Sequence, residues 1–190
     1  MARLELRHLP NLITVLRILL VPPLLWLLLH ERFTPALLLF VLAGVSDALD
    51  GALAKGFGWT SRLGGILDPI ADKLLLVGCF LVLGLGGELP LWLMVLVIGR
   101  DLLIIIGAVA YQWLIEDLQA APTWVSKCNT LAQLTLIFAL LLNHGAWTLP
   151  PLLLHLLIYV TALLTLWSGF DYVQRWGRKA RQQGRRRDGC

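Results

Sequence analysis

The chain has 190 residues, of which 58% are hydrophobic and only 15% are charged. This composition excludes an ordinary soluble domain, in which about a quarter of the residues are charged. The 16 lysines and arginines outnumber the 12 acidic residues and give a net charge of +4. The three cysteines form neither a CxxC nor a Cys/His metal pattern. We therefore expect a multi-pass membrane protein with one domain.

Apolar runs of about 20 residues, the length of a bilayer-spanning helix, follow one another along the chain. We expect an all-α bundle of six transmembrane helices, over residues 10–30, 34–55, 64–86, 90–114, 123–143 and 150–172. The first run follows two arginines as in a signal peptide. No small-residue cleavage pattern comes after it, so we expect a retained span. Residues 1–174 form the predicted membrane domain.

Lysines and arginines gather in three places: the amino terminus, the connection that holds Lys55 and Arg62, and residues 175–190. With six spans, all three places lie on one side of the membrane. The positive-inside rule then puts both termini in the cytoplasm. Residues 175–190 form a basic cytoplasmic tail, which anionic lipids attract. Nucleic acid is not an expected partner, because topology already accounts for this charge and no nucleic-acid module surrounds it.

Acidic residues inside apolar sequence are the strongest functional signal: Asp47, Asp50, Asp68 and Asp72. Each pair is three or four residues apart, so its members share a helical face. The second and third spans are antiparallel neighbours, which places all four carboxylates within roughly 12 Å of the cytoplasmic interface. Carboxylates this close repel one another and require a cation. Oxygen ligands suit magnesium, manganese or calcium, in two sites that share one carboxylate.

Small residues accompany these acids and leave room for a ligand near the backbone. They are Gly51, Ala54 and Gly64. Close helix packing in a membrane is the competing explanation for small residues alone. The competing explanation for the acids is a set of structural ion pairs. The neighbouring cations are Lys55, Arg62 and Lys73. Three cations do not balance four intramembrane acids, so a ligand site is favoured.

The stretch Asp47-x2-Asp50-Gly51-x2-Ala54-Lys55-x8-Gly64-x3-Asp68-x3-Asp72 resembles the signature D-x2-D-G-x2-A-R-x8-G-x3-D-x3-D of the CDP-alcohol phosphatidyltransferase family. The fixed positions match except Lys55, where the family has arginine. A lysine supplies the charge without the planar fork, so the phosphate contact at Lys55 is weakened or shared with Arg62. The opening LPNLITVLRILLVPP also resembles the first helix of the family, which has a six-helix membrane core.

The resemblance implies an enzyme in which an alcohol hydroxyl attacks the β-phosphorus of CDP-diacylglycerol and CMP leaves. It implies that Asp47, Asp50 and Asp68 hold two magnesium or manganese ions, one of them shared with Asp72. Asp72 is then also the general base. The CDP site that the resemblance implies contains Asp47, Asp50, Gly51, Ala54, Lys55, Arg62, Gly64 and Asp68.

The acceptor is the least determined part of the reaction. The fifth run opens with PTWVSKCNTLAQ, which is similar to the S-K-x-N-T-x2-Q segment of CMP-forming cardiolipin synthases. Phosphatidylglycerophosphate synthases tend to carry G-K-x-K-T-x2-Q there. A phosphomonoester is almost a dianion and suits two lysines, whereas a phosphodiester carries one charge. Asn129 in the second lysine's place therefore favours phosphatidylglycerol over glycerol 3-phosphate.

Two intramembrane arginines each have two alternative roles. Arg100, beside Asp101, either joins Lys127 and Asn129 in the acceptor site or pairs structurally with another span. Arg17, in the first span, forms either a salt bridge or a contact with a lipid phosphate.

Two further function classes are weighed against a transferase. A divalent-cation transporter would also place acids in helices, but transport sites tend to lie near the membrane midplane on broken helices. A lipid-binding relative without catalysis is motivated only by Lys55. Small-residue helix faces indicate a homodimer without locating its interface. The expected location is a bacterial or organellar inner membrane, with the active site facing the cytoplasm.

Overall fold

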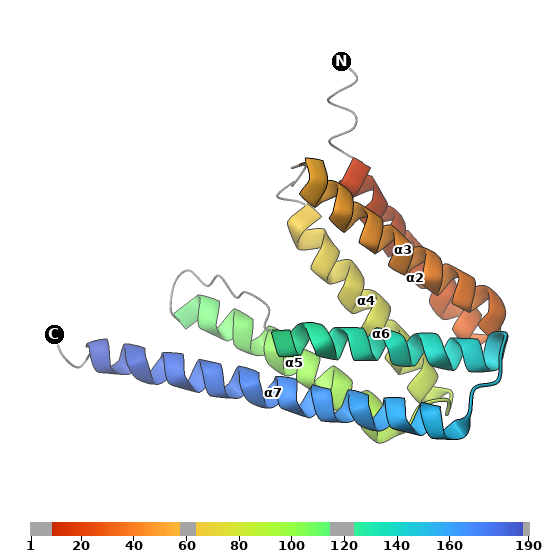
Figure 1. The fold of residues 1–190 in the computed structure, drawn as a ribbon. Coiled ribbons are helices and arrows are strands. Elements are labelled where there is room, and N and C mark those ends of the chain that lie inside the picture. The colour runs from red at the N-terminus through yellow and green to blue at the C-terminus, as the bar shows by residue number, and fades with distance from the viewer. Residues whose placement is uncertain (1–8, 58–63, 115–123, 188–190) are drawn as a thin grey trace, which may run out of the picture. The chain divides into compact units, whose positions relative to one another are not determined.

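The computed structural model describes the backbone of residues 9–57, 64–114 and 124–187 and the side chains of residues 14–47, 70–107 and 124–174. These backbone ranges contain six helices and no strand, which confirms the predicted all-α class (Figure 1). The helices are α2 (Leu9–Leu29), α3 (Phe33–Phe57), α4 (Gly64–Leu85), α5 (Leu91–Leu114), α6 (Trp124–Gly145) and α7 (Pro151–Arg187).

Helix bounds follow the apolar runs closely, with one exception. The last apolar run was expected to end at residue 172, but α7 continues to Arg187. Hydropathy cannot reveal this extension, because a polar helix has no apolar pattern to detect. The predicted division between membrane domain and tail, at residue 174, falls inside this continuous helix and stays a prediction.

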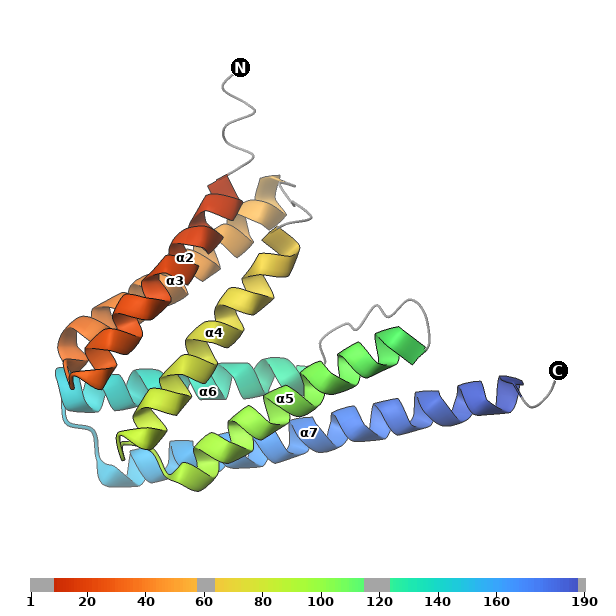
Figure 2. The same ribbon diagram turned by 180° about the vertical axis from the view of Figure 1, so that it is seen from behind.

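The chain forms two compact units. Unit 1 combines Met1–Pro90 with Ile137–Pro151, and unit 2 combines Leu91–Leu136 with Leu152–Cys190. In unit 1, α2 packs against both α3 and α4 (Figures 1 and 2). Gly78 permits part of this packing, because a Cβ atom there would lie 2.8 Å from Leu25 Cδ1. The helix on which α3 and α4 converge is therefore α2.

Tight turns close the carboxyl-terminal ends of α2 and α4 in unit 1. After α2, the Arg32 N–H donates to Leu27 O at 2.9 Å while Glu31 adopts a φ of 55°. After α4, the Glu88 N–H donates to Leu83 O at 3.0 Å while Gly87 adopts a φ of 85°. Both are helix ends closed by a residue in the left-handed region.

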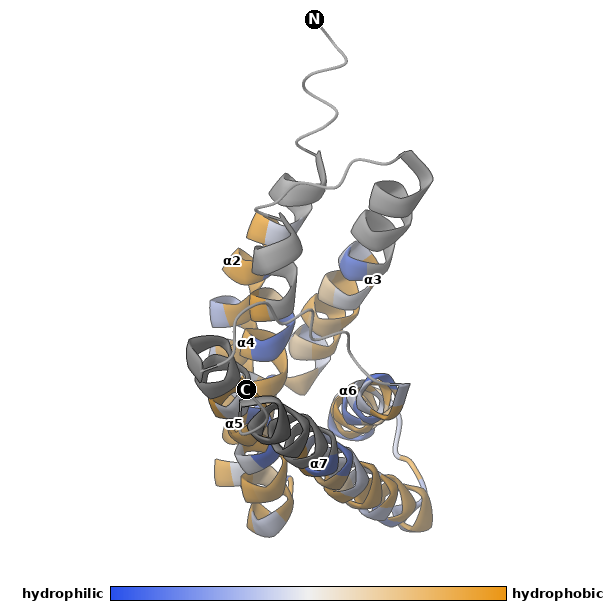
Figure 3. Ribbon diagram, turned by 90° about the vertical axis from the view of Figure 1, so that its left-hand side faces the viewer, coloured by the Kyte–Doolittle hydropathy of each residue, from blue (hydrophilic) through white to orange (hydrophobic). Residues whose placement is uncertain are grey.

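Hydrophobic residues make up most of the described helices, as the orange of the ribbon in Figure 3 shows, and many of their side chains are exposed. Examples are Leu19, Leu38, Leu85 and Leu163, each more than 60% exposed. Within the described residues, Trp124–Gly145 and Pro151–Gln174 are long and apolar enough to cross a membrane by length and composition. Thr14–Leu29 and Phe33–Asp47 are shorter apolar helices. Exposed apolar surface of this extent is typical of contact with lipid or another protein.

Candidate active site

A buried arginine on α2 links the two helices that carry the aspartate motif. Arg17 has no exposed surface. Its Nη1 lies 2.7 Å from Asp47 Oδ1 on α3 and 3.1 Å from Asp72 Oδ1 on α4. The side chains of Asp47 and Asp72 are 48% and 44% exposed. One buried cation on α2 therefore holds two accessible carboxylates, one from α3 and one from α4.

The first and last aspartates of the motif, which were expected in one acidic pocket, thus contact the same arginine. A salt bridge was one of the two alternatives for Arg17, but its two aspartate partners were not predicted. The remaining motif residues lie outside the described side chains: Asp50, Gly51, Ala54 and Lys55 in α3, and Gly64 and Asp68 in α4. Arg62 lies outside the described residues altogether. Their roles stay predictions.

The donor chemistry of this cluster fits a divalent cation. Asp47 and Asp72 offer oxygen atoms, the ligands that magnesium and manganese prefer. On ideal helices Asp50 shares the face of Asp47, and Asp68 shares that of Asp72. The single guanidinium of Arg17 carries one positive charge against the two carboxylates of Asp47 and Asp72. The described side chains, which do not include Asp50 and Asp68, contain no group of three or more His, Cys, Asp or Glu that could hold a metal ion.

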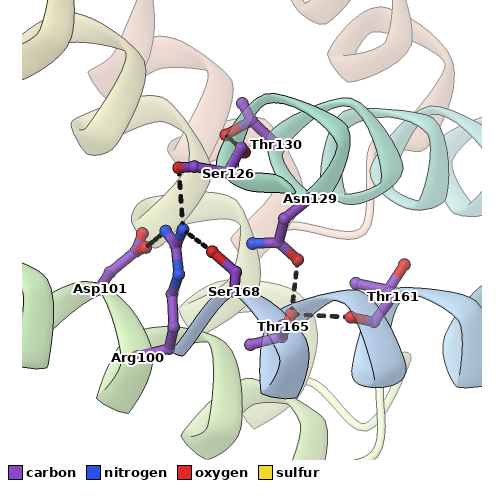
Figure 4. A network of polar contacts seen from close by, with 8 residues as sticks. All are labelled: Arg100, Asp101, Ser126, Asn129, Thr130, Thr161, Thr165 and Ser168. Atoms are coloured by element: carbon purple, nitrogen blue, oxygen red, sulfur yellow. Dashed lines mark hydrogen bonds and ion pairs between the residues drawn. The ribbon is translucent and has the colours of Figure 1, made fainter. Parts of the chain in front are cut away.

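A second polar cluster lies in unit 2, around Arg100 on α5 (Figure 4). Its Nη1 donates to Asp101 Oδ1 at 2.7 Å, and its Nη2 donates to Ser126 Oγ on α6 at 2.9 Å. Nη2 also donates to Ser168 on α7. The side chains of Arg100 and Asp101 are 5% and 2% exposed. A buried ion pair therefore ties three helices together through hydroxyl groups.

Asn129 lies beside this cluster and is buried, whereas Lys127 is exposed. Asn129 is fully buried, and its Oδ1 accepts a hydrogen bond from Thr165 Oγ1 at 2.9 Å. Figure 4 shows its amide nitrogen on the side of Ser168. Lys127 is exposed, with Nζ over the Trp124 ring at 5.1 Å from the centroid. The helix already begins at Trp124, so residues 127 and 129 point to different faces.

Three buried donor nitrogens of unit 2 have no hydrogen-bond partner within the described residues: Arg100 Nε, Asn129 Nδ2 and Gln133 Nε2. Asn129 and Gln133 are one helical turn apart on α6, so their amides share a face. Buried donors are normally paired, and leaving one unmade costs about 1–3 kcal/mol. These nitrogens could therefore donate to an oxygen-rich ligand.

The hydroxyl residues of α7 are the part of this cluster that the sequence reading missed. Thr161, Thr165 and Ser168 are all buried. They recur at intervals of four and three residues, which places them on one helical face. A polar stripe along an otherwise apolar helix was the signal that could have revealed them.

Comparisons with known proteins agree with the motif. The sequence model of the CDP-alcohol phosphatidyltransferase family matches residues 7–167. The CMP-forming cardiolipin synthase of Rattus norvegicus is 35% identical over 189 aligned residues, covering 91% of this chain and 62% of the rat protein. The CDP-diacylglycerol–glycerol-3-phosphate 3-phosphatidyltransferase of Pseudomonas fluorescens is 35% identical over 178 residues, covering 88% of this chain and 89% of that protein. The probable phosphatidylglycerophosphate synthase of Mycobacterium tuberculosis is 31% identical over 185 residues, covering 91% of this chain and 83% of that protein.

The chain has apolar helices and two aspartates held by a buried arginine. Together with the motif and these similarities, these features identify a phosphatidyltransferase. The chain belongs to the CDP-alcohol phosphatidyltransferase family. A relative named as a cardiolipin synthase and one named for transfer to glycerol 3-phosphate both match it at 35% identity, so overall similarity does not select the acceptor.

Proposed function

We propose that this protein transfers a phosphatidyl group from CDP-diacylglycerol to a hydroxyl of phosphatidylglycerol, releasing CMP and forming cardiolipin. The observation that carries the proposal is the pairing of Asp47 and Asp72 at Arg17, within a sequence that carries the family signature. Their exposed carboxylates are accessible to a substrate phosphate and to an alcohol. A transporter is disfavoured because the described halves of the motif lie in continuous helices.

Asp72 supplies the base in this reaction. Its carboxylate takes the proton of the acceptor hydroxyl, and the oxygen forms a bond to the β-phosphorus of CDP-diacylglycerol. The bond between that phosphorus and the oxygen shared with the CMP phosphate breaks, and its electron pair leaves with CMP. Asp47, Asp50, Asp68 and Asp72 would hold two magnesium or manganese ions, which screen the charge of the pyrophosphate. Lys55, with Arg62, adds positive charge beside the nucleotide phosphates.

The charge balance of the Arg100 cluster supports phosphatidylglycerol as the acceptor. Arg100 is already paired with Asp101, so the ion pair carries no net charge. Lys127 is directed to Trp124 rather than to Asn129. Asn129 offers a neutral donor, which suits a phosphodiester with one negative charge. A phosphomonoester, which is nearly a dianion at pH 7, would need a second cation here.

A membrane setting is part of the proposal. All six helices are taken to cross the bilayer, with both termini, the aspartates and the basic tail on the cytoplasmic side. The distribution of lysine and arginine and the exposed leucines support this arrangement. A bacterial or organellar inner membrane is the proposed location, and a homodimer is the proposed assembly.

Product analysis tests the proposal. Purified protein in lipid nanodiscs receives CDP-diacylglycerol with manganese and equal concentrations of phosphatidylglycerol and glycerol 3-phosphate. We expect CMP release, with cardiolipin as the faster-formed lipid by mass spectrometry. Asp72→Asn serves as the control for chemistry at this site. The absence of CMP release with either alcohol, and with serine, inositol phosphate or choline, would refute phosphatidyl transfer.

Glycerol 3-phosphate is the second candidate acceptor. The P. fluorescens relative, whose name specifies this acceptor, matches over 89% of its own length. Faster formation of phosphatidylglycerophosphate in the same assay would establish this alternative and show that the interpretation of Asn129 is wrong.

A further inference from the structure

We propose that Arg17 is a positioning residue for phosphatidyl transfer, which holds Asp72 in register with Asp47 and partly neutralises both. The inference rests on the proposed function above and assigns a role to a residue outside the aspartate motif. Arg17 lies 30 residues before Asp47 and 55 before Asp72, on a different helix from either.

The geometry favours a positioning role because a single nitrogen serves both acids. Arg17 Nη1 lies 2.7 Å from Asp47 Oδ1 and 3.1 Å from Asp72 Oδ1. The two oxygens therefore cannot be farther apart than these distances together. The guanidinium stem is fully buried on α2, which packs against both α3 and α4. Any shift of α3 against α4 would break one of the two contacts.

Accessibility separates this arrangement from a salt bridge that only stabilises the bundle. The cation is fully buried, but both acid side chains are about half exposed. Their remaining oxygens can therefore face a ligand while one oxygen of each is held. A fixed proton acceptor is what the reaction requires, because a misplacement of about 1 Å can cost roughly 100-fold in rate.

Arg17 also competes with a metal for the same carboxylates. A positive charge within hydrogen-bond distance of two proposed ligands repels an incoming divalent cation. Removing that charge should tighten metal binding, while removing the positioning contact should slow the reaction. A residue needed only for folding would not produce these opposite effects.

The test measures two quantities for Arg17→Gln in nanodiscs: manganese affinity by electron paramagnetic resonance without substrate, and kcat for CMP release per folded enzyme. We expect manganese to bind about tenfold more tightly, because a unit charge near the ion is removed. We expect kcat to fall about 100-fold. On an Asp72→Asn background, Arg17→Gln should cause no further loss of the residual rate, since it acts through that carboxylate.

Two arginine variants serve as matched controls. Arg100→Gln removes the other buried arginine and should leave manganese affinity unchanged. Arg32→Gln removes an exposed arginine of unit 1 and should change neither quantity. Arg17→Lys keeps the charge but not the forked geometry, so it should keep wild-type manganese affinity and lower kcat about tenfold. If Arg17→Gln does not fold, the kcat of Arg17→Lys is used to test the inference instead.

An unchanged kcat in the folded Arg17 variants, unchanged or weaker manganese binding by Arg17→Gln, or additive losses with Asp72→Asn would overturn the inference. If Arg17→Gln does not fold, an unchanged kcat in Arg17→Lys overturns it. A wild-type protein that releases no CMP would instead refute the proposed function, and the manganese measurement would still decide whether Arg17 competes at these carboxylates.

Discussion

Arg17 and Arg100 are both buried in apolar helices, and both contact aspartate, yet their surroundings differ. Arg17 reaches two half-exposed carboxylates on two other helices. Arg100 contacts Asp101, the next residue of its own helix, which is only 2% exposed, and serine hydroxyls on α6 and α7. The first cluster is open and acidic, and the second is closed and balanced in charge. The two clusters differ in the accessibility of their carboxylates, because Asp47 and Asp72 can reach a ligand whereas Asp101 is enclosed with its arginine.

The largest expected effect concerns stability in the closed cluster. Asp101→Asn would leave the Arg100 charge buried without its carboxylate partner. Breaking a buried pair in this way typically costs about 3–5 kcal/mol. We expect a clear fall in the free energy of unfolding, measured by thermal or denaturant unfolding in detergent. Glu31→Gln, at an exposed position, is the matched control and should unfold as the wild type does. An unchanged free energy of unfolding in Asp101→Asn would show that the Arg100–Asp101 pair does not stabilise the fold, contrary to the role assigned to the closed cluster.

The corresponding change in the open cluster should affect catalysis instead. Asp72→Asn keeps the shape of the side chain but removes the proposed base. We expect kcat for CMP release to fall at least ~100-fold, because general-base catalysis contributes about that much. CDP-diacylglycerol binding, measured by displacement of a labelled nucleotide lipid, should remain. Near-normal turnover in this variant would mean that Asp72 is not the base.

A third change tests the charge balance that was used to assign the acceptor. Asn129→Lys adds a cation to a cluster whose only described ion pair is already neutral. A charge-assisted contact of about 1.5–3 kcal/mol would shift preference toward glycerol 3-phosphate by tenfold or more. The ratio of the two lipid products by mass spectrometry measures the shift. A preference that stays constant in a folded variant would show that Asn129 does not contact the acceptor.

The smallest effect is expected at the other end of unit 1. His144 Nε2 lies 2.7 Å from Glu88 Oε2, and both side chains are partly exposed. Partly exposed pairs typically contribute less than about 1 kcal/mol. Glu88→Gln should therefore change the free energy of unfolding only slightly and leave kcat as in the wild type. A large loss of activity would mean that this end of the unit communicates with the aspartates.

Much of the fold follows from the sequence, because apolar runs of membrane-spanning length leave few alternatives. The bounds of α2 to α6 lie close to those expected from hydropathy and proline positions. The extension of α7 to Arg187 could not be predicted in this way, since its residues 175–187 are mostly polar. The number of membrane crossings and the orientation of the termini stay predictions.

Some features of the candidate site could be predicted from the spacing of residues along a helix. Contacts that depend on how a helix is rotated about its axis could not. The sequence placed Asp47 and Asp72 in one acidic pocket, and both contact Arg17. It also placed Lys127 with Asn129 in one acceptor site, but Lys127 Nζ lies over the Trp124 ring. The rotation of α2 that directs Arg17 toward both acids is set by packing with α3 and α4, which no local pattern encodes. Likewise, consecutive residues rarely face each other on a helix, so the contact between Arg100 and Asp101 was not expected.

Metal-dependent CMP release tests the central claim most directly, because it requires the open acidic cluster to act as a phosphatidyl-transfer site. Wild-type protein in nanodiscs would be assayed with CDP-diacylglycerol and phosphatidylglycerol in manganese, then in excess EDTA, and again after manganese is restored. The account predicts rapid CMP release, its loss in EDTA and its recovery with the metal. Full activity in EDTA would contradict the role assigned to the aspartates around Arg17.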